Sequence, residues 1–163
     1  MRDIIKPSFI PPPDIRQLRN LLRFRMKLTY QINGMKNRVL NCLTVSNHKL
    51  DDVFFDVFGK SSRSIIKQIL EQPIETFDVT PFVNKRCKHP IDEIQAAIDG
   101  AICLEQTTKL IIYLDYIDKL DKRIDELDSE IFSLAEPYSV ALDFIRTVLG
   151  LSKKAFNGNS HTF

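Results

Sequence analysis

A heptad repeat of apolar residues is the feature of this sequence that most constrains its fold. Over four heptads the apolar positions are separated alternately by three and four residues, without interruption. They are Leu110, Tyr113, Ile117, Leu120, Ile124, Leu127, Ile131 and Leu134. A helix with this repeat has one apolar seam, which stays buried when the helix supercoils around a second helix. The repeat therefore predicts a coiled coil and leaves open whether the partner helix belongs to the same chain.

A partner helix within the chain is predicted over residues 14–48. From Ile15 to His48 the sequence has no proline, and Gly34 is the only glycine. Apolar residues recur in this segment at steps of three and four, the spacing of one face of a helix. They are Leu21, Phe24, Leu28, Ile32, Met35, Val39 and Cys42. A helix of this length extends roughly 50 Å.

The predicted fold class is all-α, an elongated helical hairpin with a four-heptad coiled-coil segment and short capping helices. The first long helix is expected to pack antiparallel on a second helix over 90–136. Antiparallel pairing would place Leu21 and Phe24 near Ile131 and Leu134.

The capping helices are predicted between the two long ones. The first covers residues 50–59 and ends at Gly59, because glycine commonly terminates a helix. The second covers residues 60–72, with Ser61 or Ser62 as its N-cap.

Charge is unevenly distributed along the 163 residues. Residues 1–50 carry 10 Lys and Arg against 2 Asp and Glu, whereas residues 51–163 carry 13 against 19. This asymmetry favours either an anionic partner for the first third of the chain or pairing between the two parts.

Composition excludes several classes of protein. With only 5 glycines, none of them in a Gly-rich loop, a phosphate-binding loop of that kind is ruled out. The cysteines Cys42, Cys87 and Cys103 lack the paired spacing of a disulfide framework or a zinc site. No apolar run reaches the length of a membrane span, and the start is unlike a signal peptide, so we expect a cytoplasmic protein without membrane contact.

A row of four basic residues lies on one side of the first predicted helix. Its members, called the basic row below, are Arg16, Arg19, Arg23 and Lys27. Steps of three and four place them within about 80° of each other on a helix turning 100° per residue. Such a row can follow a nucleic-acid backbone, because neutralised phosphates release their counterions. The alternatives are a solvated helix face or pairing with acidic residues of the heptad helix, namely Asp118, Asp121, Asp125 and Asp128.

No catalytic constellation can be assembled from the residues. Two-metal catalysis needs carboxylates that converge from separate elements, whereas the paired carboxylates here are neighbours on predicted helices and point apart. They are Asp51 with Asp52, Asp92 with Glu93, and Asp125 with Glu126. The three histidines have no metal-ligand spacing, and the serines at 61, 62 and 64 have no nearby base.

Several short elements follow one another in an order that is specific to one family. They are IPPPDIRQLR, R-x-R-x-K-L, K-N-R and DVFGKS, and then DEIQAA, the coiled-coil segment and LDFIRTVLG. In this order they resemble the central part of transposases of the insertion sequence 110 family. These bacterial DEDD transposases have a RuvC-like domain and are understood as bridge-RNA-guided DNA recombinases. The resemblance covers about residues 2–150.

The resemblance implies that both catalytic regions of the family lie outside this chain. Four metal-binding acidic residues of the RuvC-like domain precede the segment matching Phe9 to Pro13. A nucleophilic serine of the C-terminal domain follows the segment matching Ile145 to Gly150. No catalytic residue and no metal ligand can therefore be carried over. No cofactor is expected in this fragment, although the family uses magnesium in the missing domain.

The family architecture also implies boundaries within the chain. They are a proline-rich extended lead-in at 1–13, a helical and coiled-coil domain at 14–136, the start of a truncated C-terminal transposase domain at 137–150, and a frameshifted tail at 151–163. Leu149 stands where the family has proline, and the match fails after Ser152. Back-translation of FNGNSHT, read one base later, permits an apolar run of the kind that the family has there. Codon degeneracy permits other readings as well.

The expected function is that of a truncated DNA transposase fragment which retains nucleic-acid-binding and oligomerisation surfaces and lacks catalysis. Its expected partners are DNA, a structured guide RNA, and a second copy or an intact transposase. The oligomerisation surface would be the heptad seam, because an isolated hairpin would leave much of it exposed. Its residues are Leu110, Ile117, Leu120, Ile124, Leu127, Ile131 and Leu134. The alternative is a coiled-coil interaction protein without nucleic-acid binding.

Overall fold

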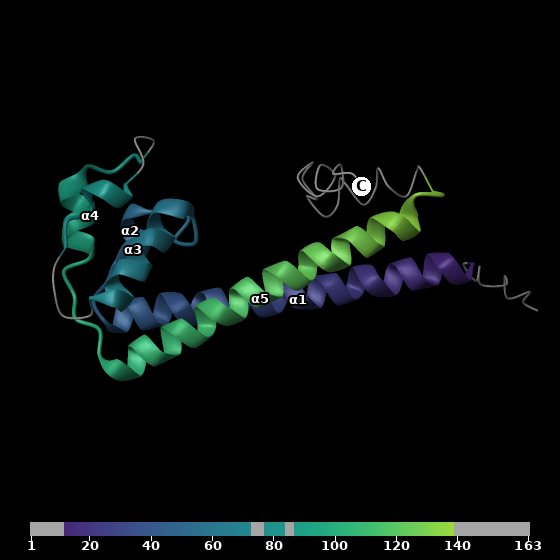
Figure 1. Ribbon diagram of the computed structural model, residues 1–163, viewed down its shortest axis with the longest axis horizontal. Coiled ribbons are helices and arrows are strands. Elements are labelled where there is room, and N and C mark those ends of the chain that lie inside the picture. Colours follow the sequence, from purple (N-terminus) through teal and green to yellow (C-terminus); the bar gives the residue numbers. More distant parts are fainter. Residues whose placement is uncertain (1–11, 73–76, 84–86, 139–163) are drawn as a thin grey trace, which may run out of the picture. The chain divides into compact units, whose positions relative to one another are not determined.

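The computed structural model describes residues 12–72, 77–83 and 87–138, and the described part of the chain is all-α (Figure 1). The prediction of fold class is confirmed. The elements are α1 (Pro13–Val45), α2 (Leu50–Val53), α3 (Lys60–Glu71), the 3-10 helix η1 (Thr80–Phe82), α4 (Ile91–Ala97) and α5 (Leu104–Ala135). Most of the predicted lead-in and transposase-domain start, and all of the predicted tail, lie outside the described residues.

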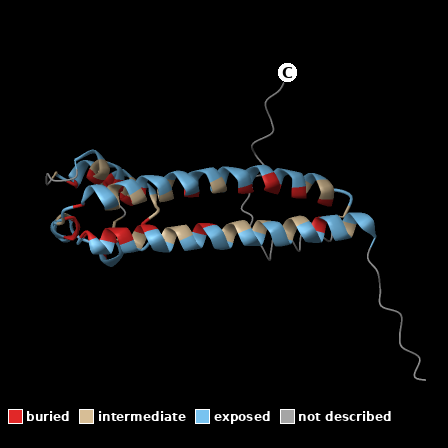
Figure 2. Ribbon diagram, turned by 90° about the horizontal axis from the view of Figure 1, so that it is seen from below, coloured by how far each residue is buried: buried red, intermediate tan, exposed pale blue. Residues whose placement is uncertain are grey.

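The chain divides into two compact units, and both long helices contribute to each. The first unit contains residues 1–31 and 120–163, and the second contains residues 32–119. Within each unit the buried and half-buried residues of α1 and α5 lie on the sides where the two helices face each other (Figure 2). Their packing confirms the predicted pairing of the two long helices.

In the first unit, α1 and α5 form an antiparallel pair around one apolar seam. The Tyr138 hydroxyl lies 3.3 Å from a carboxylate oxygen of Asp14, so the start of α1 is beside the end of α5. The buried cluster of this pair consists of Leu18, Leu127, Ile131 and Ala135, with Leu21, Leu22, Leu28 and Leu134 packed against it.

The seam of α1 follows the predicted one at every position except Phe24. Leu21 packs near Ile131 and Leu134 as expected, but the prediction for Phe24 is wrong, because that side chain is 53% exposed. The position that continues the three-and-four spacing from Leu18 and Leu21 is residue 25, an arginine. Reading only apolar residues therefore assigned to Phe24 a place that Arg25 occupies.

The second unit has a core assembled from several helices. Its most deeply buried side chains come from α1, α2, α3, α4 and α5. They include Leu43, Leu50, Ile65, Ile66, Ile94 and Leu110. Burial of each such side chain contributes about 1.5–3 kcal/mol relative to exposure. This unit holds most of the buried apolar residues of the described chain.

One predicted helix of the second unit is shorter than expected, and the next has a different N-cap. The helix predicted over 50–59 ends at Val53, because Phe54 adopts an extended conformation. Asp56 then accepts a hydrogen bond from the backbone N–H of Phe58 at 2.9 Å, and this local bond competes with continued helix. The next helix does form, but its N-cap is Gly59 and not a serine.

The single helix predicted over 90–136 is interrupted between α4 and α5. A Cβ atom added at Gly100 would lie 2.4 Å from the carbonyl oxygen of Ser46, so only glycine allows this close approach. The backbone N–H of Lys49 also donates to the carbonyl of Ala97 at 2.8 Å. These contacts tie the interruption to the end of α1.

Candidate nucleic-acid interface

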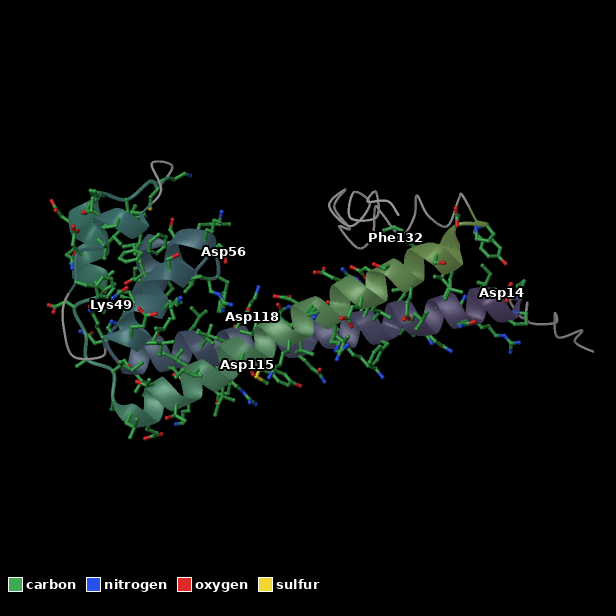
Figure 3. All side chains as sticks on the ribbon, in the orientation of Figure 1. Asp14, Lys49, Asp56, Asp115, Asp118 and Phe132 are labelled. Carbon is green, nitrogen blue, oxygen red and sulfur yellow. The ribbon has the colours of Figure 1, made fainter. Side chains whose placement is uncertain are left out.

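The basic row lies on the open face of α1 in the first unit. All four of its side chains are exposed, and on a helix turning 100° per residue they lie opposite the face of Leu18, Leu21 and Leu28. Nitrogen-tipped side chains project from this half of α1 on the side away from α5 (Figure 3). The helix contains no acidic residue after Asp14, so its own sequence offers no carboxylate to the row.

The other basic residues of α1 are each engaged by a neighbour. The Arg25 guanidinium binds Asp128, the Lys36 ammonium lies 5.1 Å from the ring centre of Phe58, and Arg38 lies 5.9 Å from that of Tyr113. In the part of the chain that the structure describes, no member of the basic row forms an ion pair. The row is thus the set of α1 cations left available to an external anion.

Two of the acidic residues named as competing partners of the row are engaged by other arginines. Asp128 is bound by Arg25, and Asp118 is bound by Arg63 of α3 within the second unit. The Asp125 side chain is exposed. Asp118 and Asp128 therefore do not neutralise the basic row in the described part of the chain.

Arg25 and Asp128 form an enclosed ion pair that the sequence patterns did not reveal. The guanidinium donates from Nε to Oδ1 at 2.5 Å and from Nη2 to Oδ2 at 2.9 Å. Only 14% of the Arg25 side chain and 5% of the Asp128 side chain remain exposed. Such bidentate geometry is the strongest form of arginine–carboxylate pairing. The sequence signal that could have revealed this ion pair is the position of Arg25, which stands where the heptad spacing of α1 places a core residue.

The heptad residues proposed for oligomerisation are covered by the chain itself. Five of the seven are buried, and Leu120 and Leu134 are half-buried. The expectation that an intramolecular hairpin leaves much of this seam exposed is wrong. The exposed large apolar residues of α5 are Leu104, Ile111, Ile112 and Tyr116, of which Ile111 and Ile112 lie away from the seam.

A second row of basic residues lies on α3. Lys60, Arg63 and Lys67 repeat the spacing of the first three members of the basic row. Here carboxylates are close, since Arg63 binds Asp118 and the Lys67 ammonium lies 3.8 Å from Glu71. We call these three residues the α3 row.

Groups able to support metal or thiol chemistry are dispersed. Among the described residues, no three His, Cys, Asp or Glu side chains are grouped so that they could hold a metal ion. Burial raises the pKa of the Cys42 thiol and lowers the pKa of His48, an effect that the backbone of Ile98 partly opposes. An open cavity of about 610 Å³ beside α2 is lined by Asp51, Asp52 and His89 among others.

Comparisons with known proteins place no further constraint on this interface. No protein-family model, curated protein or solved structure matches the chain. Among the described helices, none combines the length and apolar character needed to cross a membrane.

Proposed function

We propose that this chain binds nucleic acid through the basic row, as a helical module of a DNA transposition system. The observation that carries the proposal is that the cations of the row form no ion pair with the described residues. Four exposed cations share one face of α1, and every other cation of that helix is engaged within the fold. A phosphate backbone supplies the regularly spaced anions that such a row lacks.

The dimensions of the row fit a nucleic-acid strand. Arg16 and Lys27 are eleven residues apart, which corresponds to about 16 Å along a helix axis. A strand carries one phosphate for roughly every 3.4 Å of duplex axis, so the row spans about five nucleotides. Four contacts over that distance would fix the position of a strand without reading its bases.

The resemblance to insertion sequence 110 transposases supports the same surface. The element IPPPDIRQLR contains Arg16 and Arg19, and the element R-x-R-x-K-L contains Arg23 and Lys27. Under this proposal the chain acts in the cytoplasm on DNA or on a structured guide RNA. Catalysis and its magnesium would come from a separate transposase, with which the chain would assemble.

Salt dependence tests the proposal directly. With about four phosphate contacts, a plot of log affinity against log salt concentration should have a slope of roughly −3 to −4. The double variant Arg19→Gln with Arg23→Gln should weaken binding to all sequences alike and reduce the steepness by about two. The variant Lys119→Gln with Lys122→Gln, which removes two charges from α5, serves as the matched control and should keep the wild-type slope. Binding with no salt dependence, or no binding, contradicts the proposal.

A protein-interaction module is the second candidate, and one observation favours it. Ile111 and Ile112 are 52% and 58% exposed on the side of α5 away from the heptad seam. Exposed apolar groups of this kind occur at association surfaces. Salt-insensitive self-association in sedimentation, lost in an Ile111→Lys with Ile112→Lys variant and accompanied by no nucleic-acid binding, would support this candidate instead.

A further inference from the structure

We propose that Tyr30 is a base-stacking residue and that the ligand of the basic row is single-stranded nucleic acid. The inference rests on the proposed function and adds the class of nucleic acid. Tyr30 is 65% exposed and lies in the same unit as the row. At 100° per residue it falls between Arg19 and Arg23 around the helix, one turn beyond Lys27 along it. The cationic face therefore ends in an open aromatic ring.

The Tyr30 side chain is not needed for packing within the fold. The ring lies opposite the seam formed with α5, and its hydroxyl makes no hydrogen bond to the described residues. A second aromatic ring, that of Phe24, is 53% exposed at one edge of the same face. Lys36 and Arg38, also on α1, have aromatic neighbours from other segments, Phe58 in the turn before α3 and Tyr113 of α5. Tyr30 and the row lie on the open side.

A surface that combines cations with exposed aromatic rings favours single-stranded nucleic acid, whose bases are unpaired. Phosphates bound by Arg23 and Lys27 would hold the backbone alongside the helix, within a few ångströms of the Tyr30 ring along its axis. Every unpaired base has a face that can stack on such a ring, while the bases of a duplex are already stacked on each other. The row alone would bind either form, and Tyr30 would distinguish them.

The test compares three forms of the whole chain on single-stranded and double-stranded probes. The probes are a dT oligonucleotide, a U oligonucleotide and a duplex of equal length, with affinity measured by fluorescence anisotropy. Tyr30→Ala should weaken binding to both single strands by about 5- to 150-fold and leave duplex affinity and the salt slope unchanged. Tyr30→Phe should retain the wild-type preference, because its ring is kept. Tyr116→Ala, which removes an exposed tyrosine of α5, should bind all three probes as wild type.

Each outcome separates this inference from the proposed function. Steeply salt-dependent binding that is equal in wild type and Tyr30→Ala on every probe overturns the stacking role and leaves the basic row intact. Equal loss on single strands and duplex also overturns it, since stacking would not affect a duplex. Absence of salt-dependent binding in the wild type removes both proposals. A preference for only one of the two single strands would identify DNA or RNA as the source of the ligand.

Discussion

The two faces of α1 in the first unit place basic residues in opposite electrostatic settings. On the packed face, Arg25 is enclosed and bound by both oxygens of Asp128. On the open face, the four cations of the basic row are exposed and have no carboxylate on their own helix after Asp14. An arginine on the packed face stabilises the fold, whereas an arginine on the open face is available to a ligand.

The α3 row shows that spacing alone does not define a binding surface. It repeats the steps of three and four found in the basic row, yet Asp118 and Glu71 lie beside two of its members. Exposed pairs of this kind contribute only about 0–1 kcal/mol each to stability, but they also offset the local positive charge. The comparison indicates that neighbouring carboxylates, more than the pattern of cations, decide which row can attract phosphate.

The largest effect is expected on the packed face of α1. Asp128→Ala leaves the Arg25 guanidinium enclosed without a counter-charge and should lower the free energy of unfolding by about 3–5 kcal/mol. The double variant Arg25→Met with Asp128→Leu should recover most of that loss, since apolar residues of similar volume can replace an enclosed ion pair. Urea denaturation followed by circular dichroism measures both. If Asp128→Ala were as stable as wild type, the ion pair would not be enclosed in solution.

His48 extends the comparison to a titratable group that is enclosed without a carboxylate partner among the described residues. Burial lowers its pKa, so below the ordinary value of 6.5 the unfolded chain binds a proton that the folded chain does not. Stability should therefore fall as the pH drops from 7.5 to 5.5, by at most about 1.4 kcal/mol per pH unit. His48→Leu should be at least as stable at pH 7.5 and should flatten this dependence. If the stability of wild type and of the His48→Leu variant depended on pH in the same way, the pH dependence would not come from His48.

A smaller effect is expected on the α3 row. Arg63→Gln removes the pair with Asp118, whose side chain is 60% exposed. The free energy of unfolding should change by about 0–1 kcal/mol, and Asp118→Asn should change it by a similar amount. Thermal denaturation at low and high salt measures the difference. If the free energy of unfolding fell as much as in Asp128→Ala, the α3 row would stabilise the fold as strongly as Arg25 does.

The sequence predicted the long-range pairing better than the local boundaries. The seam from Leu110 to Leu134 was recognisable because its apolar residues occur without a gap over four heptads. One position of the partner seam was misassigned to Phe24, because Arg25 stands at a core position where only apolar residues were sought. The interruption near Gly100 depends on its contact with Ser46, and such contacts between distant segments leave no local pattern.

The candidate site could be predicted only in part, for a related reason. Spacing placed Arg16, Arg19 and Arg23 on one face of a helix, and the structure leaves that face open. The engagement of Asp118 and Asp128 by other arginines was not predictable, because it depends on contacts between segments far apart in the sequence. Tyr30 was missed because its angular position matters only once the packed face of the helix is known.

The most direct test of the account is the change in salt slope when each basic row loses two charges. The basic-row variant is Arg19→Gln with Arg23→Gln, and the α3-row variant is Lys60→Gln with Lys67→Gln. The two changes are equal in net charge, so a general electrostatic attraction would affect both alike. We predict that the first reduces the steepness of log affinity against log salt by about two and that the second leaves it unchanged. Equal reductions, or a larger one for the α3 row, would contradict the claim that the open face of α1 is the nucleic-acid interface.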